Sequence, residues 1–242
     1  MEPPRIVPNA RQRVRAAVTA DIVAEARRQV AEVGAGALSL RAVARELGMA
    51  SSAMYRYFAS RDELLTALIV EAYDALGVVA EDAAEATAAD KAFVRWQTVC
   101  RAIRRWAILH PHEYVLLYGS PVPGYQAPQV TLAPASRVTL ALAGLLRDAQ
   151  ASGELDAFDG PLVPRALASD VRPVAEVALP GVPLPTAVAG LLVWTQLFGQ
   201  ISFELFGRFA GIVTDPEGLF EHAVVAMAHQ LGIRPPRAGR SR

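Results

Sequence analysis

Hydrophobic positions in the first third of the chain recur every three or four residues, which is the period of an amphipathic helix. The pattern predicts a first helix over residues 11–33, which ends where Gly34 and Gly36 follow. Its expected buried side chains are Val14, Ala17, Val18, Ile22 and Ala26. A later helix is predicted to begin after Ser60, which together with Glu63 forms a capping-box pattern, and to extend toward Ala86.

Two short helices joined by a tight turn are predicted between Ser39 and Phe58. Ser39 is a good N-cap, and Gly48 stands where a chain leaves a helix through the left-handed conformation. The second segment, residues 51–57, is too short to be stable alone and must be held by packing. Helix, glycine turn and short helix make up a helix-turn-helix, whose second helix enters the DNA major groove. The alternative is a helical hairpin with a polar face.

The remaining chain also carries helical rather than alternating patterns, so the fold class is expected to be all-α. Further helices are predicted over residues 90–109, 113–117, 135–151, 165–178, 186–209 and 215–231, separated by loops rich in proline and glycine. The helix over residues 186–209 is apolar on all sides, which permits a membrane span. Prolines shorten it, polar side chains interrupt it, and basic clusters do not flank it, so we favour a core or subunit-interface helix and no membrane.

Small and basic side chains dominate the expected DNA-facing surface of the helix-turn-helix. Small side chains allow a close approach to base edges, and arginine suits both phosphates and guanine. The basic start of the first helix either contacts phosphates or the minor groove, or is simply solvated. The candidate DNA contacts are Arg11, Arg13, Ser39, Leu40, Arg41, Ala50, Ser51, Ser52, Ala53, Tyr55, Arg56, Tyr57 and Arg61.

Residues 11 to about 80 resemble the DNA-binding domain of the TetR/AcrR family of bacterial transcriptional regulators. The resemblance rests on the runs Leu40–Ala44, Leu47–Met49 and Met54–Phe58, and on Ser60-Arg61 followed by Leu64-Leu65. The chain departs from the family pattern at Ala50-Ser51, where Ser then Lys is common, and at Arg56, where a His-type residue is usual. These departures concern the operator sequence.

A looser resemblance links the C-terminal part to a domain type of actinobacterial members of this family. It rests on Trp194–Gly207, His110-Pro111 and Tyr118–Pro121, and implies an all-α ligand-binding and dimerisation domain. The expected organisation is a flexible arm at 1–10, a helix-turn-helix DNA-binding domain at 11–60, a connecting helix at 61–86, the C-terminal domain at 87–233 and a disordered basic tail at 234–242.

Two sets of residues are expected to carry the C-terminal functions. A single aromatic side chain is more often core than ligand contact, but as a set they favour an apolar pocket between helices, lined by Trp96, Trp106, Tyr114, Tyr118, Trp194 and Phe198. The apolar stripes of the last two helices favour pairing with their symmetry mates through Leu197, Ile201, Leu205, Phe220, Val224 and Met227.

Cysteine content and charge distribution indicate the cellular compartment and the kind of partner. Cys100 is the only cysteine, which excludes an internal disulfide and fits a reducing cytoplasm. The start of the chain lacks the layout of a signal peptide. Residues 1–63 carry ten arginines against seven acidic residues, and four arginines follow Gly232, so the formally neutral chain has basic ends and an acidic middle. This distribution suits a protein that touches DNA with one face.

Enzyme and metal functions have little support in the sequence. It contains neither a glycine-rich phosphate loop nor a nucleophile elbow, so neither an enzyme nor a cofactor is expected. His110, His112 and Glu113 do not have metal-ligand spacing, and solvated or capping histidines are favoured there.

We therefore expect a homodimeric repressor that binds a palindromic double-stranded DNA operator and releases it when a small apolar ligand binds. The alternative is a soluble helical interaction module or a small enzyme with an incidental helix-turn-helix.

Overall fold

The protein is described here by a computed structural model that covers residues 9–235. Within that range the fold is all-α, as predicted, and its only β-type pairing is an isolated bridge between Leu155 and Ile233. The 1–10 arm and the 234–242 tail expected from the sequence lie almost entirely outside the described residues. The helices are α1 (Ala10–Val33), α2 (Leu40–Glu46), α3 (Ser51–Met54), α4 (Arg61–Ala86), α5 (Ala92–Leu109), α6 (Pro111–Tyr118), α7 (Leu132–Ala151), α8 (Arg165–Ala178), α9 (Leu184–Leu205) and α10 (Pro216–Gln230), with short 3₁₀ turns at Ala35–Ala37 and Gln129–Thr131.

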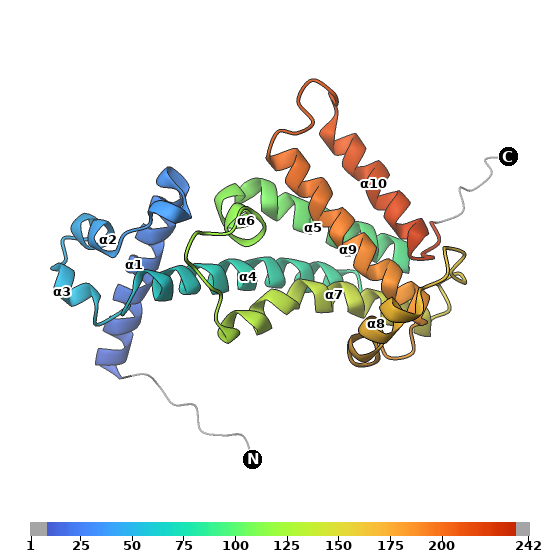
Figure 1. The fold of residues 1–242 in the computed structure, drawn as a ribbon, viewed down its shortest axis with the longest axis horizontal. Helices are drawn as coiled ribbons and strands as arrows, with labels where there is room; N and C mark the ends of the chain where they lie inside the picture. Colours follow the sequence, from blue (N-terminus) through green and yellow to red (C-terminus); the bar gives the residue numbers. More distant parts are fainter. Residues whose placement is uncertain (1–8, 236–242) are drawn as a thin grey trace, which may run out of the picture.

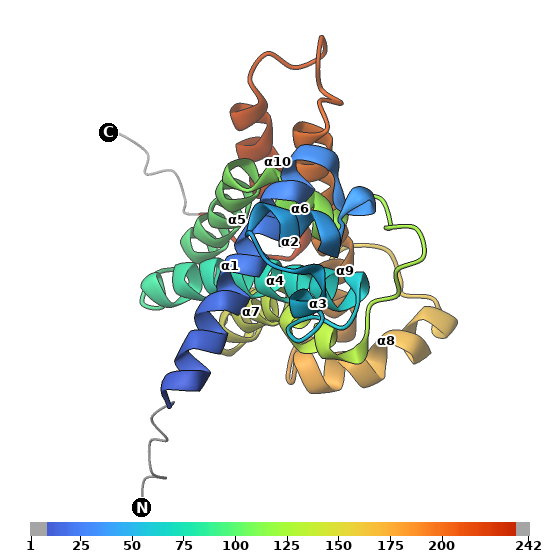
Figure 2. The same cartoon turned by 90° about the vertical axis from the view of Figure 1, so that its left-hand side faces the viewer.

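Helices α1 to α3 and the first half of α4 form a small head (Figure 1). Its core includes Ile22, Ala26, Val43, Met54 and Leu65, all with 0% of their surface exposed. The sequence predicts that Val14 and Ala17 are buried, but both are exposed, Val14 to 64%, because the N-terminal turns of α1 extend beyond the head core (Figure 2). The exposed start of α1 is therefore a basic projection rather than a packed element.

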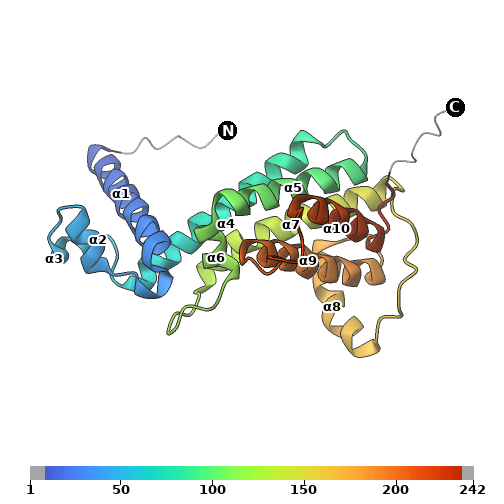
Figure 3. The same cartoon turned by 90° about the horizontal axis from the view of Figure 1, so that it is seen from above.

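Helix α4 runs from the head into the larger body (Figures 1 and 3). Its first half packs into the head core through Leu64 and Leu68, and its second half packs into the body core through Leu76 and Ala80. The Ser60 hydroxyl accepts a hydrogen bond from the Glu63 N–H (3.1 Å), and the Glu63 carboxylate accepts one from the Ala59 N–H (2.6 Å). One continuous helix, capped by Ser60 and Glu63, thus belongs to both cores.

The body consists of α5 to α10 packed around the second half of α4. Helices α9 and α10 lie side by side and pack on α5, while α7 packs along α4 (Figure 3). By length and hydropathy, two segments could cross a membrane, residues 129–151 and Leu184–Leu205. This is weak support for a membrane span, since core helices meet the same criteria, and α9 buries Val193, Leu197 and Ile201 in the body core.

Candidate nucleic-acid interface and ligand pocket

The turn between α2 and α3 fixes the position of the second motif helix. Gly48 has φ = +63°, the left-handed conformation that glycine adopts at little cost, and it ends α2 as the sequence predicts. Met54 and Phe58 are buried in the head core and hold α3 from beneath. Regular α-helix covers only Ser51–Met54, and the expected continuation over residues 55–57 is a hydrogen-bonded turn. Packing of two buried side chains therefore positions the short recognition segment.

Most of the side chains expected for DNA contact are exposed on the head. Residues 50–52, Tyr55 and Arg56 are exposed, while Ala53 and Tyr57 are half-buried. Arg41 on α2 is exposed, and so are Arg11 and Arg13 at the start of α1. The half-buried Ser39 caps α2, with its hydroxyl 3.5 Å from the N–H of Ala42. The recognition segment thus combines small residues at its start with an exposed tyrosine and arginine at its end.

The structure gives two of the predicted contact residues a supporting position instead. The Leu40 side chain is buried in the head core, with 7% of its surface exposed. The Arg61 guanidinium donates hydrogen bonds to the carbonyl oxygens of Ala35 (2.8 Å), Gly36 (3.1 Å) and Leu38 (3.2 Å). Since these bonds occupy the guanidinium, we reassign Arg61 from DNA contact to fixing the segment that precedes α2.

Arg15 belongs to the basic start of the first helix, which the sequence predicts to contact DNA or to be solvated, and it joins α1 to the recognition segment. Its guanidinium donates a hydrogen bond to the Arg56 carbonyl oxygen (2.8 Å) and lies 5.1 Å from the centre of the Tyr57 ring. The sequence contained only a weak signal for this role, a basic residue on the first helix, because the partner lies 41 residues away. Arg15 braces the backbone of Arg56, whose own side chain is free to point outward.

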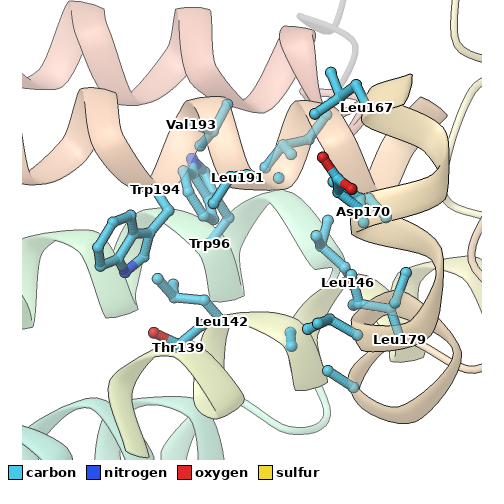
Figure 4. Close-up of a pocket in the computed structure, with 18 residues that line it drawn as sticks. Trp96, Thr139, Leu142, Leu146, Leu167, Asp170, Leu179, Leu191, Val193 and Trp194 are labelled. Carbon is cyan, nitrogen blue, oxygen red and sulfur yellow. The ribbon is translucent and has the colours of Figure 1, made fainter. Parts of the chain in front are cut away.

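A cavity of about 610 Å³ lies in the body between α5, α7, α8 and α9 (Figure 4). Its lining is almost entirely apolar, with aliphatic side chains such as Leu142, Leu146, Leu167 and Leu191. Helix α8 forms one wall through a face that is apolar except for Asp170, and it packs mainly on α9. The size and apolar lining are those of a site for a small organic molecule.

Two of the six aromatic residues predicted for the pocket line this cavity, Trp96 and Trp194. The Trp96 indole N–H donates a hydrogen bond to the Val224 carbonyl oxygen (2.9 Å), whereas the buried indole N–H of Trp194 has no partner within the described range. Trp106 is instead buried in the core, and its ring centre lies 5.2 Å from that of His110. The pocket prediction is therefore corrected: its wall is mainly aliphatic, and most of the chosen aromatic residues pack elsewhere.

Tyr114, Tyr118 and Phe198 belong to a run of ring contacts that leads from the cavity to α4. Ring centres lie 5.5 Å apart between Trp194 and Phe198, 4.4 Å between Phe198 and Tyr118, and 6.2 Å between Tyr118 and Tyr73 on α4. The Tyr114 hydroxyl donates to the Phe198 carbonyl oxygen (3.0 Å), and burial raises the pKa of Tyr114 to about 12. These rings connect the pocket wall to the helix that enters the head.

A second connection to α4 runs through α7. The Arg137 guanidinium bonds the carboxylates of Asp74 (2.7 Å) and Glu81 (2.5 Å), both on α4, and its side chain lies over Gly77. A Cβ atom at Gly77 would lie 2.8 Å from Arg137, so glycine is the residue that allows this close approach. The hydrogen bonds from Arg137 hold the pKa of Glu81 below its usual range. Since Leu142 and Leu146 of α7 also line the cavity, α7 touches both the cavity and α4.

The residues predicted for the subunit interface lie mostly inside the subunit. Leu197, Ile201, Phe220, Val224 and Met227 each have 0% of their surface exposed in the single chain, and Leu205 is half-buried. Their side chains fill the body core, so they cannot face a partner chain in this conformation. The apolar stripe seen in the sequence is the inward face of α9 and α10.

The outward faces of α9 and α10 carry a different set of residues. Leu192 is 62% and Phe203 is 55% exposed on α9, with the small residues Thr195 and Gly199 between them. His222 and His229 are exposed on α10. These faces, rather than the buried stripes, are available to another molecule.

The described residues form neither a metal site nor a reactive thiol site. Within residues 9–235, no group of three or more His, Cys, Asp or Glu side chains is placed to hold a metal ion. His110 approaches Glu113 at 3.8 Å and stacks on Trp106. Burial raises the pKa of the Cys100 thiol well above its ordinary value, which keeps it neutral and unreactive in the core.

Comparison with known proteins assigns both parts of the chain. A family model described as bacterial regulatory proteins of the tetR family matches residues 22–68, and one described as a tetracyclin repressor-like C-terminal domain matches residues 96–227. The HTH-type transcriptional regulator Rv1816 of Mycobacterium tuberculosis is 41% identical over 214 residues, which cover 87% of this chain and 91% of that protein. The regulator Mb1846 of Mycobacterium bovis has the same identity and coverage.

Solved structures agree with this assignment. The crystal structure of the candidate regulatory protein SCO4313 has 34% sequence identity and a TM-score of 0.74, and the match covers 92% of this chain and 100% of that chain. The TetR family regulator PfmR of Thermus thermophilus shares the fold at a TM-score of 0.56 and 21% identity, over 88% of this chain and 99% of that chain. With its helix-turn-helix head, its helical body and relatives of this similarity, the chain belongs to the TetR family of transcriptional regulators.

Proposed function

We propose that this regulator is a repressor that binds a palindromic operator as a homodimer in the cytoplasm and is released by a small apolar ligand. The family membership supports a regulatory role, and we propose that the protein has no enzymatic activity of its own. The observation that carries the proposal is the recognition segment, the helix α3 and the turn after it: Ser51, Ser52, Tyr55 and Arg56 are exposed, and Met54 and Phe58 anchor the segment in the head core. An exposed second helix of this kind fits a major groove.

The DNA-binding part of the proposal can be tested by selecting fragments from the genome of origin and measuring affinity at several salt concentrations. Specific binding should weaken as salt rises, because phosphate contacts release counterions. A selected sequence with two inverted half-sites about one helical turn apart, or a multiple of it, would support the two-fold arrangement. Equal affinity for selected and unselected DNA would contradict sequence-specific regulation.

For the dimer, we propose that the outward faces of α9 and α10 pair with the same faces of a second chain. The exposed Leu192 and Phe203 supply apolar area, and Thr195 and Gly199 allow helices to approach closely. A two-fold axis then makes a self-complementary interface. Replacement of Leu192 by Glu should yield folded monomers in sedimentation, while a dimer that persists unchanged would place the interface elsewhere.

For release, we propose that ligand in the cavity shifts α4 relative to the body. Both connections described above end on one stretch of α4: Tyr73 receives the run of aromatic rings, and Asp74 and Glu81 receive Arg137. The same helix packs into the head core through Leu64 and Leu68. A ligand can change DNA affinity only if it binds the two arrangements of α4 with different affinity.

A further inference from the structure

The apolar cavity of the body carries one charged side chain among the described residues that line it, the carboxylate of Asp170 on α8. Asp170 is solvent-exposed and forms neither an ion pair nor a hydrogen bond within residues 9–235. The neighbouring Arg172 lines a separate hollow together with Glu176 rather than the cavity. Among residues 9–235, this carboxylate at the cavity wall has no positive partner.

The opposite part of the cavity is aromatic. In Figure 4 the Trp194 ring lies across the view from Asp170, with Leu191 between them and Leu142 below Trp194. Trp96 adds a second indole, and the remaining lining is aliphatic apart from Thr139 and Asp170. A molecule that spans this space meets apolar walls and indole rings along its body, and a negative charge at its end.

We propose that the ligand of this regulator is an amphipathic organic cation. Its apolar body fills the cavity against Trp96 and Trp194, and its positive group pairs with the exposed carboxylate of Asp170. This inference rests on the proposed ligand-binding function of the body and adds the class of ligand.

The charge of the whole body favours the same ligand class. Residues 64–232 contain seventeen acidic and ten basic side chains, so a cation is attracted and an anion repelled at long range. In the part of the chain that the structure describes, no lysine or arginine lines the cavity to pair with a carboxylate or phosphate on the ligand. Apolar burial supplies most of the affinity, and Asp170 selects among head groups.

The test compares three probes with the same ten-carbon tail: decyltrimethylammonium, 1-decanol and decanoate. Binding to the full-length protein is measured without DNA by calorimetry and by intrinsic tryptophan fluorescence, in which Trp96 and Trp194 line the cavity and Trp106 gives a background signal. Each probe is titrated into the unmodified protein, Asp170→Asn and Asp170→Lys. Glu176→Gln is the matched control, because it removes the same charge from the same helix outside this cavity.

The cation should bind the unmodified protein, and Asp170→Asn should weaken its binding about fivefold, the upper range for a partly exposed ion pair. Decanol should change less than twofold, and Asp170→Lys should bind decanoate more tightly than the unmodified protein does. Glu176→Gln should leave the cation affinity unchanged. Failure of the cation to bind, equal cation affinity in Asp170→Asn, or equal losses for cation and decanol would overturn the proposal. Since no DNA is present, these outcomes are independent of whether the cation releases an operator.

Discussion

In the head, inward-facing side chains such as Ile22, Met54 and Leu65 fill their core, and the residues proposed to meet DNA project from the outer surface. In the body, the helices leave a cavity of about 610 Å³ and the proposed ligand site lies within it. The proposed DNA contact of the head thus uses the exposed surface of a packed core, whereas the proposed ligand site of the body uses unfilled space inside a core. A larger side chain should therefore stabilise the fold where it fills the cavity and destabilise it where the core is already filled.

The largest effect should come from a charge placed in the filled part of the body core. Val224→Asp introduces a carboxylate where the native side chain has 0% exposure, and it should lower the free energy of unfolding by more than about 4 kcal/mol. Solubility and thermal melting measure this effect. Val177→Asp, the same substitution at a position 82% exposed, is the control and should fold normally. A soluble, well-folded Val224→Asp monomer would restore the interface predicted from the sequence.

On the surface of the head, function should be lost without loss of stability. Arg56→Ala should weaken operator binding by about 1–3 kcal/mol, concentrated on one base position if Arg56 reads a base. Arg147→Ala, an exposed arginine of the body, is the matched control for a change in net charge. Gel-shift titrations against single-base operator variants separate the cases. A uniform loss across variants would indicate a phosphate contact, and unchanged affinity would remove Arg56 from the interface.

A pair of identical substitutions contrasts the cavity with the packed core around it. Ala143→Leu points into the cavity and should raise the free energy of unfolding by about 1–2 kcal/mol through added apolar burial, while blocking ligand binding. Ala80→Leu, at a position of 0% exposure outside the cavity, should lower it by about 1–3 kcal/mol through overpacking. Urea denaturation measures both. If both variants are destabilised alike, the cavity is not open space in the protein.

The smallest effect concerns the contact between α7 and α4. Arg137 lowers the pKa of Glu81 in the folded state. The ionised carboxylate therefore stabilises the fold at pH values above 4.5, its ordinary pKa, and this stabilisation is lost as the pH falls through the lowered pKa. The melting temperature of Arg137→Gln should therefore lie below that of the unmodified protein at neutral pH, and the two should converge under acidic conditions. A difference that stays constant with pH would mean that Glu81 is not the group involved.

The extent to which the structure could be predicted differs between the two parts. Helix periodicity and caps lie within a few residues of one another, so the helices of both parts and the turn at Gly48 could be predicted from the sequence. The position of Arg61 could not, because the carbonyl oxygens it binds belong to a segment more than twenty residues upstream. A basic residue near a recognition helix looks the same whether it meets phosphate or its own backbone.

The prediction of the cavity-lining residues was largely wrong because it too depends on contacts between distant segments. Large apolar rings are typical of ligand pockets, but they also fill space in a core, as Tyr114 and Phe198 do in the body. The cavity forms where small side chains such as Ala143, Ala175 and Gly190 face one another across helices distant in sequence. For α9 and α10, the sequence predicts that the apolar stripe faces a partner chain, but it faces the body core. A subunit interface and a subunit core both favour apolar residues at the helical period, so the pattern alone does not separate them.

Release of DNA by a ligand requires coupling between the cavity and the head. The most direct measurement titrates decyltrimethylammonium, or another ligand found to quench Trp96 and Trp194, into the protein with and without saturating operator DNA. We predict that operator DNA weakens ligand binding by at least tenfold, or about 1.4 kcal/mol, and that the ligand weakens operator binding by the same factor. A ligand that fills the cavity and binds equally well in both titrations would contradict release through this body.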